Sequence, residues 1–273
     1  MKDKVMPKIS VLMSVFNDAA TVEKSIDSIL NQSFADFELI ICDDGSTDNT
    51  KELVLQKQKE DGRIIFIKND ENRGLSYSLN HCLSKAVGEY CARMDGDDLC
   101  DAERFQVQSD FLDEHPQYAF VSTTMKRFDE QGIYSVGNHC VSEPTPVDFI
   151  AGSPFCHAPV MIRTAAYQAV NGYRDVDRTR GVEDYDLWFR LYAAGYRGYN
   201  LNMPLYSMFD GRDADKRRTW RRRKNEAWVR FCGYRMLKLP KRYYVYALKP
   251  ILLGMLPMPL YRVLHRKHIQ KVQ

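Results

Sequence analysis

The sequence predicts an α/β protein whose central sheet is mainly parallel. In the first hundred residues, short β-branched apolar runs alternate with longer segments of helical periodicity, which is the pattern of successive βα units. The chain has 273 residues, of which 44% are hydrophobic and 12% aromatic, so it can bury the core of one large domain, alone or with an appendage. Three βα units in succession favour a nucleotide-binding sheet.

The elements of this first part follow from the spacing of the apolar residues. Ile9–Val15 is predicted to form the first strand. Asn17 or Asp18 can cap the next helix, in which four apolar residues recur at i, i+4, i+7 and i+8 on one face: Val22, Ile26, Ile29 and Leu30. Further strands are predicted at Phe37–Cys42, Ile64–Lys68 and Tyr90–Met94, and further helices at Thr47–Lys59 and Leu75–Ala86.

Beyond residue 100 the alternation weakens, and the sheet is predicted to become mixed. A hairpin is indicated at Arg127–Val141, around the turn segment Glu130-Gln131-Gly132. Gly195 is a suitable C-cap for a helix at Val182–Ala194. The other predicted elements are a helix at Glu103–Glu114 and strands at Tyr118–Thr123 and Ala158–Ile162.

Charge is distributed unevenly along the chain. The net charge is only +3, but residues 216–273 contain 17 Lys and Arg against one acidic residue, a net +16 that leaves −13 for residues 1–215. We therefore predict a main domain over residues 1–215, with halves of about 1–100 and 101–215, and a basic amphipathic helical extension over 216–273. The extension is expected to meet an anionic partner.

The cysteines and the apolar runs bear on the compartment. The seven cysteines indicate reduced thiols, because their number is odd and none is spaced as CxxC. No apolar region of a secretory signal follows Met1–Lys8, and the uncharged stretch Pro250–Tyr261 is far shorter than the ~20 apolar residues that span a bilayer. We expect a cytoplasmic protein without a transmembrane helix.

Carboxylates gather where ligands bind in an open α/β sheet, at the carboxyl ends of the strands. Acidic segments follow the second and fourth predicted strands, at residues 43–48 and 95–98, and Glu183-Asp184 opens a later helix. Turn formation and helix capping explain isolated aspartates, but the three carboxylates within 95–98 repel one another unless a cation offsets their charge. Mg²⁺ or Mn²⁺ is the predicted cation, because either takes one or two carboxylates and leaves positions open for a nucleotide diphosphate.

Two common nucleotide motifs are absent. The chain has neither a GxxxxGK[ST] segment nor a GxGxxG after the first strand, which argues against P-loop hydrolysis and dinucleotide redox chemistry.

Five segments, in their order and spacing, resemble the family 2 glycosyltransferases with the GT-A fold, over roughly residues 8–200. They are Ile9–Asn17, Asp43–Asp48, Asn72–Leu75 with Asn80, Asp95–Asp98 and Glu183–Trp188. The resemblance extends to bacterial enzymes that assemble capsule, lipopolysaccharide O-antigen or exopolysaccharide.

The resemblance implies a donor site in residues 1–100. Asp44 would bond the uracil of a UDP-sugar and Asp43 would orient its loop, while Arg73 would reach the base or a phosphate. Asp95 would face the ribose, the sugar or the metal; which of Asp97 and Asp98 ligates the metal directly stays open. The residues implied to contact the base and ribose are Ser14, Phe16 and Asn17, although core packing is an equal alternative for Phe16.

The resemblance also implies an inverting transfer, with an acceptor site in residues 101–215. Asp184 matches the family's general base, Glu183 is the second candidate, and an N-cap role is the alternative for Asp184. The implied acceptor contacts are His157 and Trp188; His157 is also a candidate metal ligand or an ordinary structural histidine. Many relatives carry a metal-binding His after the last core strand, where this chain has Tyr206–Asp210, so Asp210, Asp213 or water would take that position.

The basic extension allows more than one interpretation. Its arginine-rich start with interleaved aromatics is compatible with nucleic-acid binding. However, the acidic main domain shows no nucleic-acid module, so nucleic acid is not predicted as a partner. We favour Arg217 or Arg218 closing over the diphosphate. Tyr243–His268 mixes apolar, Tyr and cationic residues, which is typical of a segment lying on an anionic membrane; the alternative is that it packs on the main domain.

The sequence thus predicts an inverting, metal-dependent glycosyltransferase at the cytoplasmic face of the membrane. It would move a hexosyl or N-acetylhexosaminyl group from a UDP-sugar to a glycan acceptor, most plausibly a lipid-linked one. Two alternatives remain: a nucleotidyltransferase, which would release pyrophosphate instead of UDP, and a non-catalytic nucleotide-sugar-binding protein.

Overall fold

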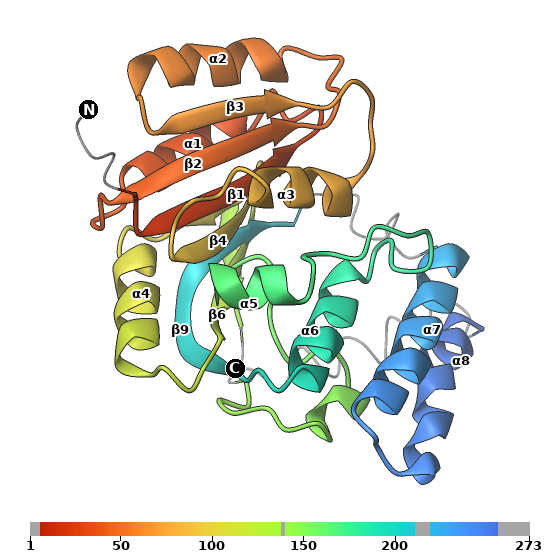
Figure 1. Cartoon of the computed structure of the whole chain (residues 1–273). Coiled ribbons are helices and arrows are strands. Elements are labelled where there is room, and N and C mark those ends of the chain that lie inside the picture. Colours follow the sequence, from red (N-terminus) through yellow and green to blue (C-terminus); the bar gives the residue numbers. More distant parts are fainter. Residues whose placement is uncertain (1–5, 138–139, 211–218, 256–273) are drawn as a thin grey trace.

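One mixed sheet, with helices on both faces, organises the protein (Figure 1). The computed structural model describes residues 6–137, 140–210 and 219–255. Within them the strands follow the order β3-β2-β1-β4-β8-β6-β9-β5, and β7 pairs with β6 outside this path.

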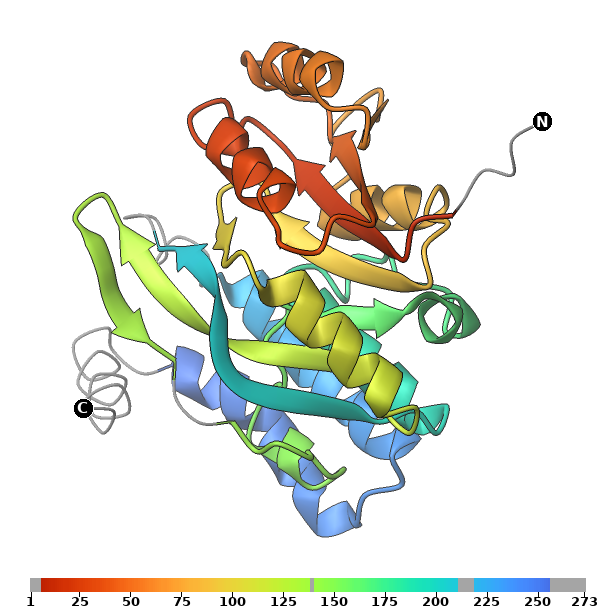
Figure 2. The same cartoon turned by 90° about the vertical axis from the view of Figure 1, so that its left-hand side faces the viewer.

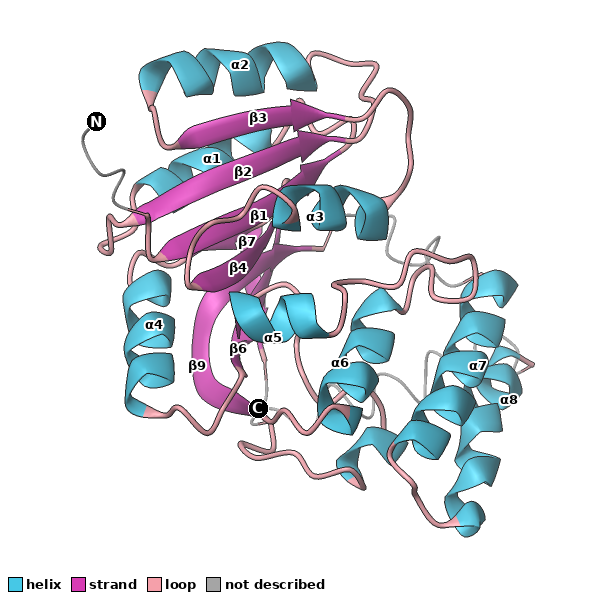
Figure 3. Cartoon of the chain, in the orientation of Figure 1, coloured by secondary structure: helices cyan, strands magenta, loops and turns pink. Residues whose placement is uncertain are grey.

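The first half of the sheet is parallel, as predicted. Its strands are β1 (Ile9–Val15), β2 (Phe37–Asp43), β3 (Ile64–Lys68) and β4 (Tyr90–Asp95), and its helices are α1 (Val22–Leu30), α2 (Thr50–Glu60) and α3 (Leu75–Leu83). In Figure 3, α3 lies in front of these strands and α1 behind them. The predicted alternation of this half is confirmed, with ends displaced by at most a few residues.

The second half of the sheet is mixed. Strands β6 and β9 are parallel, whereas β8 pairs antiparallel with both β4 and β6, and β5 pairs antiparallel with β9. Figure 2 shows the β6–β7 hairpin extending from the sheet. The strands are β5 (Leu99–Cys100), β6 (Phe120–Asp129), β7 (Gly132–Val136), β8 (Met161–Arg163) and β9 (Gly198–Phe209); the helices are α4 (Arg104–Glu114), η1 (Asp148–Ile150), α5 (Thr164–Ala169) and α6 (Glu183–Ala193).

The sheet separates two apolar clusters. Along β1, Val11 and Met13 belong to one cluster, with α1 and α2, while Leu12 belongs to the other, with α3 and α6. This alternation follows from the two-residue period of a strand, and burial on both faces explains why the parallel strands are almost wholly apolar. The cluster of Leu12 is the one that supports the second half of the chain, and the fully buried Trp188 belongs to it.

The described part of the extension packs on this second cluster. It consists of α7 (Trp220–Met236), the 3₁₀ helix η3 (Lys241–Leu248) and α8 (Lys249–Gly254). A Cβ at Gly233 of α7 would lie 2.3 Å from the Phe189 ring, so glycine permits the close approach of α7 to α6. Tyr234 is fully buried there. No helix in the described ranges has the length and apolar content needed to cross a bilayer.

Candidate active site

The carboxyl ends of three neighbouring strands bring the predicted site loops together. In register, Ser14 of β1 lies between Cys42 of β2 and Asp95 of β4. The loop after β4 is held against α1, because the Gly96 carbonyl accepts hydrogen bonds from Thr21 Oγ1 at 3.1 Å and Ser25 Oγ at 2.9 Å. A Cβ at residue 96 would lie 2.7 Å from Asp18 Oδ2 and 2.8 Å from Cγ1 of the buried Val15, so glycine leaves the room that this contact needs.

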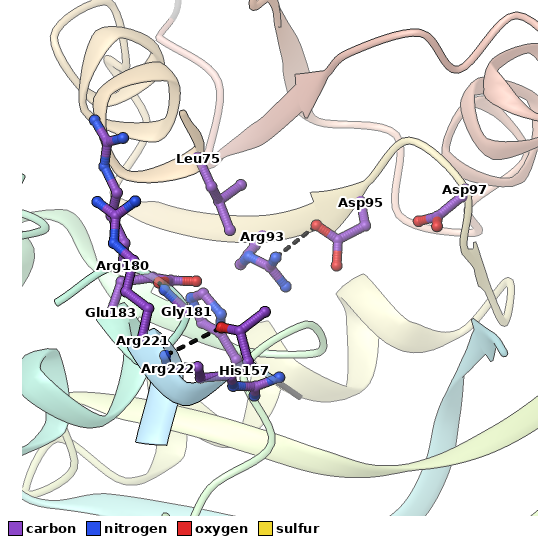
Figure 4. A pocket seen from close by; sticks show the side chains of 11 residues that line it. Leu75, Arg93, Asp95, Asp97, His157, Arg180, Gly181, Glu183, Arg221 and Arg222 are labelled. Carbon is purple, nitrogen blue, oxygen red and sulfur yellow. Dashed lines mark hydrogen bonds and ion pairs between the residues drawn. The ribbon is translucent and has the colours of Figure 1, made fainter. Parts of the chain in front are cut away.

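A pocket of about 540 Å³ opens beside this loop. Figure 4 shows Asp95 and Asp97 on one side of it and Glu183 with several arginines on the other. Carboxylates from distant parts of the sequence therefore face one cavity. The lining residues are Leu75, Arg93, Asp95, Asp97, His157, Arg180, Gly181, Glu183, Thr219, Arg221 and Arg222.

Arg93 is a pocket residue that the sequence analysis missed. Its Nη2 donates to Asp95 Oδ1 at 2.5 Å, and its Nε is buried without a hydrogen-bond partner among the described residues. Burial lowers the pKa of Arg93, but the nearby acidic groups, Asp95 foremost, together outweigh that effect and the pKa is raised overall. Its signal in the sequence was a charged residue inside an otherwise apolar buried strand, and Arg93 fixes where Asp95 points.

Asp97 and Asp98, the two candidates for direct metal contact, lie in different environments. Asp98 is 2% exposed, and its oxygens accept from the Tyr206 hydroxyl at 2.8 Å and the Phe209 N–H at 2.7 Å. Burial and the charges of Asp95 and Asp97 raise the pKa of Asp98 to about 8. The expectation that Asp98 faces the metal is thus corrected: it anchors β9 beneath the loop, and Asp97 lines the pocket.

Asp95 and Asp97 fit a hard divalent cation. They supply carboxylate oxygens at the edge of an open pocket, which is the donor set Mg²⁺ and Mn²⁺ prefer. Burial raises the pKa of Asp18, beside the loop, to about 6, and the negative charges of Asp97 and Asp95 contribute, which shows a local excess of negative charge. Among the described residues no three His, Cys, Asp or Glu side chains form a metal-binding group, so two carboxylates would leave several positions to phosphate or water.

The carboxylate of Asp44 binds the backbone of the Arg73 loop, so two residues predicted at the donor site lie next to each other. Asp44 Oδ1 accepts from the Arg73 N–H at 2.9 Å, and Oδ2 accepts from the Gly74 N–H at 2.7 Å. Gly74 has a φ of 90°, which favours glycine. Asp43 Oδ1 accepts from the Ser46 N–H at 2.8 Å and so stabilises the turn after β2, in the orienting position expected of it.

The loop after β1 is joined to the loop after β2. Asn17, at a φ of 56°, accepts through Oδ1 from the Thr47 N–H at 2.9 Å, and its own N–H donates to Ser46 Oγ at 3.0 Å. Phe16 is 42% exposed, so the core-packing alternative does not hold for it. Base and ribose contacts from Ser14, Phe16 and Asn17 remain predictions.

The base candidates Glu183 and Asp184 occupy the first turn of α6. The N-cap position is Val182, so the alternative of Asp184 as an N-cap is not what the structure shows. Glu183 lines the pocket and accepts from the Gly181 N–H at 2.7 Å. Burial and the Glu183 carboxylate raise the pKa of Asp184 to about 6, although Arg93 and Arg222 act in the opposite direction. A carboxylate that titrates near neutrality is suited to accept a proton.

The two predicted acceptor contacts have different environments. His157 lines the pocket, and its Nε2 is 2.5 Å from the Tyr173 hydroxyl; burial and the charge of Arg93 hold its pKa well below the usual range, so it is a neutral hydrogen-bonding group. Trp188 is fully buried, with its ring stacked on Phe120 at 5.0 Å between centroids. The prediction of an acceptor contact by Trp188 is therefore wrong, because its helical position faces the core.

The structure leaves some of the charged candidates undescribed and gives others a different environment from the predicted one. Arg217, Arg218 and Asp213 lie outside the described residues. Asp210, suggested as a substitute metal ligand, instead pairs with Arg127 at 3.5 Å and accepts a hydrogen bond from Tyr134. The pocket arginines that were not predicted are Arg180, Arg221 and Arg222. The basic run 216–224 did signal the last two, but not which of its members face the pocket.

Comparison with known proteins agrees with this geometry. A model of glycosyl transferase family 2 matches residues 10–171. The chain is 42% identical over 264 residues to the protein named glycosyltransferase EpsE of Bacillus subtilis, covering 96% of this chain and 95% of EpsE. It is 28% identical over 204 residues, 72% of this chain and 75% of the relative, to the Escherichia coli protein named UDP-Glc:alpha-D-GlcNAc-diphosphoundecaprenol beta-1,3-glucosyltransferase WfaP. Among solved structures, S. aureus TarS 1-349 in complex with UDP-GlcNAc matches with a TM-score of 0.71 at 17% identity, over 92% of this chain and 77% of that one; the fold is shared.

Proposed function

The chain belongs to glycosyl transferase family 2 and is a glycosyltransferase, and we propose that it moves a hexosyl or N-acetylhexosaminyl group from a UDP-sugar to a glycan acceptor, with inversion at the anomeric carbon. The observation that carries this proposal is one pocket with Asp95 and Asp97 on one side and Glu183, which precedes Asp184 in the first turn of α6, on the other. Direct displacement needs a stabilised leaving group on one side of the reacting carbon and a base on the other.

On the leaving-group side, Asp95 and Asp97 would hold Mg²⁺ or Mn²⁺, with Arg93 fixing Asp95. When bound, such an ion supplies positive charge to the departing diphosphate. Arg73, 48% exposed in its side chain, pairs with Glu71 at 3.7 Å and lies over the Tyr77 ring at 4.6 Å; from this exposed position it would reach the base or a phosphate at the other end of the donor site. The name of WfaP, a UDP-Glc enzyme, supports a UDP-sugar as donor.

On the acceptor side, Asp184 would accept the proton of the attacking hydroxyl. Glu183 stays the second candidate, because it lines the pocket directly. The neutral His157 would hydrogen-bond an acceptor hydroxyl. The WfaP name includes a diphosphoundecaprenol-linked sugar, which supports a lipid-linked glycan acceptor in surface polysaccharide synthesis.

The first test is release of UDP from a panel of UDP-sugars with Mn²⁺ or Mg²⁺. We expect one sugar nucleotide to give UDP, and EDTA to abolish the release because the diphosphate loses its counter-charge. Release of pyrophosphate instead of UDP would favour the nucleotidyltransferase alternative. Metal-independent release would contradict the assigned roles of Asp95 and Asp97.

We also propose that the extension lies on an anionic membrane at the cytoplasmic face. Apolar side chains of η3, of α8 and of the residue that follows α8 are exposed beside cations: Val245, Tyr246, Leu248, Leu252 and Met255, with Lys241, Arg242 and Lys249. Apolar groups among cations favour insertion at the headgroup level of anionic lipids. Such placement would bring the pocket to a lipid-linked acceptor.

Flotation with phosphatidylglycerol-containing liposomes tests this placement. We expect the wild-type chain to float and the Leu248→Ser/Leu252→Ser variant to stay behind, because both side chains are exposed and their loss removes insertion without disturbing the core. The matched control is Ile133→Ser/Val136→Ser, which removes two equally exposed apolar side chains from β7. Equal flotation of all three proteins would contradict the proposal.

A further inference from the structure

Three arginines from two elements surround the helix side of the pocket. Arg180 precedes α6, and Arg221 and Arg222 come from the first turn of α7. In Figure 4 they lie beside Glu183, across the pocket from Asp97. We call Arg180, Arg221 and Arg222 the arginine rim.

The arginine rim is held in place by buried contacts. The side-chain amide of Asn225, 5% exposed, donates to the Asp177 carbonyl at 2.8 Å and to the Arg180 carbonyl at 3.0 Å, and so joins α7 to the loop before α6. Gly181 has a φ of 81°, and a Cβ there would lie 3.3 Å from Arg222 Cγ. The stem of Arg222 therefore lies directly against this loop, next to the backbone N–H that binds Glu183.

Within the described part of the chain the rim makes few ion pairs, although Glu183 lies beside it and the charge of Arg222 acts to lower the pKa of Asp184. Arg221 and Arg180 share one exposed carboxylate, that of Asp177, at 2.9 and 3.6 Å. Arg222 makes no ion pair among the described residues. The first turn of α7 contains no acidic residue, although the helix dipole favours anions there and disfavours cations. Two guanidinium groups in the first turn of α7, with that of Arg180 beside them, are unfavourable for the protein alone, and a bound anion would offset that cost.

The position of the rim indicates which anion. The donor diphosphate would be neutralised at Asp95 and Asp97, and the sugar would lie between that site and the α6 carboxylates. A group beyond Glu183 belongs to the acceptor. We propose that the arginine rim binds a phosphate group of the acceptor, such as the diphosphate of a lipid-linked glycan; this rests on the proposed function. Guanidinium groups match phosphate oxygens in a bidentate manner and hold a charge that does not titrate.

A two-stage titration tests the rim. The full-length enzyme is first saturated with UDP and Mn²⁺, and then titrated with farnesyl diphosphate, a short lipid diphosphate, with Mn²⁺ in excess of both. We expect the Arg221→Gln/Arg222→Gln variant to bind farnesyl diphosphate at least about ten-fold more weakly than wild type, because two charge-assisted contacts are lost. Its UDP affinity should stay within about two-fold. Arg235→Gln, which removes a charge from the exposed far end of α7, should leave both affinities unchanged.

The outcomes distinguish recognition of the phosphate from recognition of the lipid, and binding of the acceptor from binding of the donor. Competition by inorganic pyrophosphate but not by farnesol would assign recognition to the phosphate and not to the lipid. If the double variant lost UDP affinity, the rim would serve the donor diphosphate, and the proposal would be overturned while the proposed function stood. Absence of farnesyl diphosphate binding to the UDP-loaded wild type would also overturn it. Only a wild-type protein that failed to bind UDP with Mn²⁺ would contradict the proposed function itself.

Discussion

The Asp184→Asn variant should retain UDP-sugar binding and lose roughly 10²–10⁴-fold in the rate of transfer, the usual contribution of a positioned general base. Asn keeps the shape of the side chain at the start of α6 but cannot accept a proton. Because Val182 and not Asp184 is the N-cap, the substitution does not remove a helix cap. Calorimetry of donor binding, paired with single-turnover transfer, measures the two effects separately.

The pH dependence of transfer should carry the same signature. Burial and the Glu183 carboxylate raise the pKa of Asp184 to about 6, so Asp184 is protonated and inactive as a base below that pH. Transfer by the wild type is therefore expected to rise with pH through about 6 and then level off. Glu183→Gln removes the neighbouring negative charge, so the inflection should move to lower pH while most of the plateau rate remains.

Glu183→Gln also distinguishes the two base candidates. If Glu183 were the base, this variant would lose transfer and Asp184→Asn would keep it. Unchanged turnover in Asp184→Asn would refute the assignment of Asp184. Thermal melts of both variants control for unfolding, and neither is expected to melt below the wild type, because the raised pKa of Asp184 means that its charge is unfavourable in the fold and Glu183 is partly exposed.

The parallel half of the sheet could be predicted because its signals are local. Each strand there is an apolar run buried on both faces, and each helix has a periodic stripe, so neighbouring residues specify the element. The carboxylates of the site were found for the same reason, since the ends of such strands are known once the strands are. The second half lacks this regularity, and its longest strand, β9, was not predicted. In β9 the pairing with β6 shifts register between Thr123 and Met125, next to Pro204, so no simple alternation is visible in the sequence.

The direction of individual side chains was the part that the sequence did not determine. Asp97 and Asp98 are adjacent and chemically identical, yet one faces the pocket and the other is buried under β9, 108 residues away from its partner Tyr206 in sequence. Trp188 lies on the helix that opens with the base candidates, but one turn beyond them its side chain is packed in the apolar cluster and does not reach the pocket. The arginine rim depends on the docking of α7, a tertiary contact that a run of basic residues does not encode.

Substitutions of Asp97 and Asp98 test whether these two adjacent carboxylates have the different roles that the structure indicates. Asp97→Ala should abolish metal-dependent UDP release while leaving the melting temperature near that of the wild type, because Asp97 is a partly exposed residue of the pocket lining. Asp98→Ala should lower the melting temperature, since it leaves the Tyr206 hydroxyl and the Phe209 N–H without their acceptor. Each orphaned buried donor costs about 1–3 kcal/mol. In a chain of this size, each kcal/mol corresponds to roughly 2–4 °C.

The two variants are expected to differ in UDP release and in melting temperature because the two carboxylates act on different parts of the molecule. Asp98 ties β9 to the loop after β4, so its loss loosens the support of Asp95 and Asp97, and added Mn²⁺ would restore part of the activity by holding the loop from the pocket side. Asp97 would contact the ion itself, so excess Mn²⁺ should not rescue Asp97→Ala. A titration of UDP release against Mn²⁺ for both variants, beside their melting curves, measures this difference. If Mn²⁺ rescued Asp97→Ala but not Asp98→Ala, the roles of the two residues would have to be exchanged.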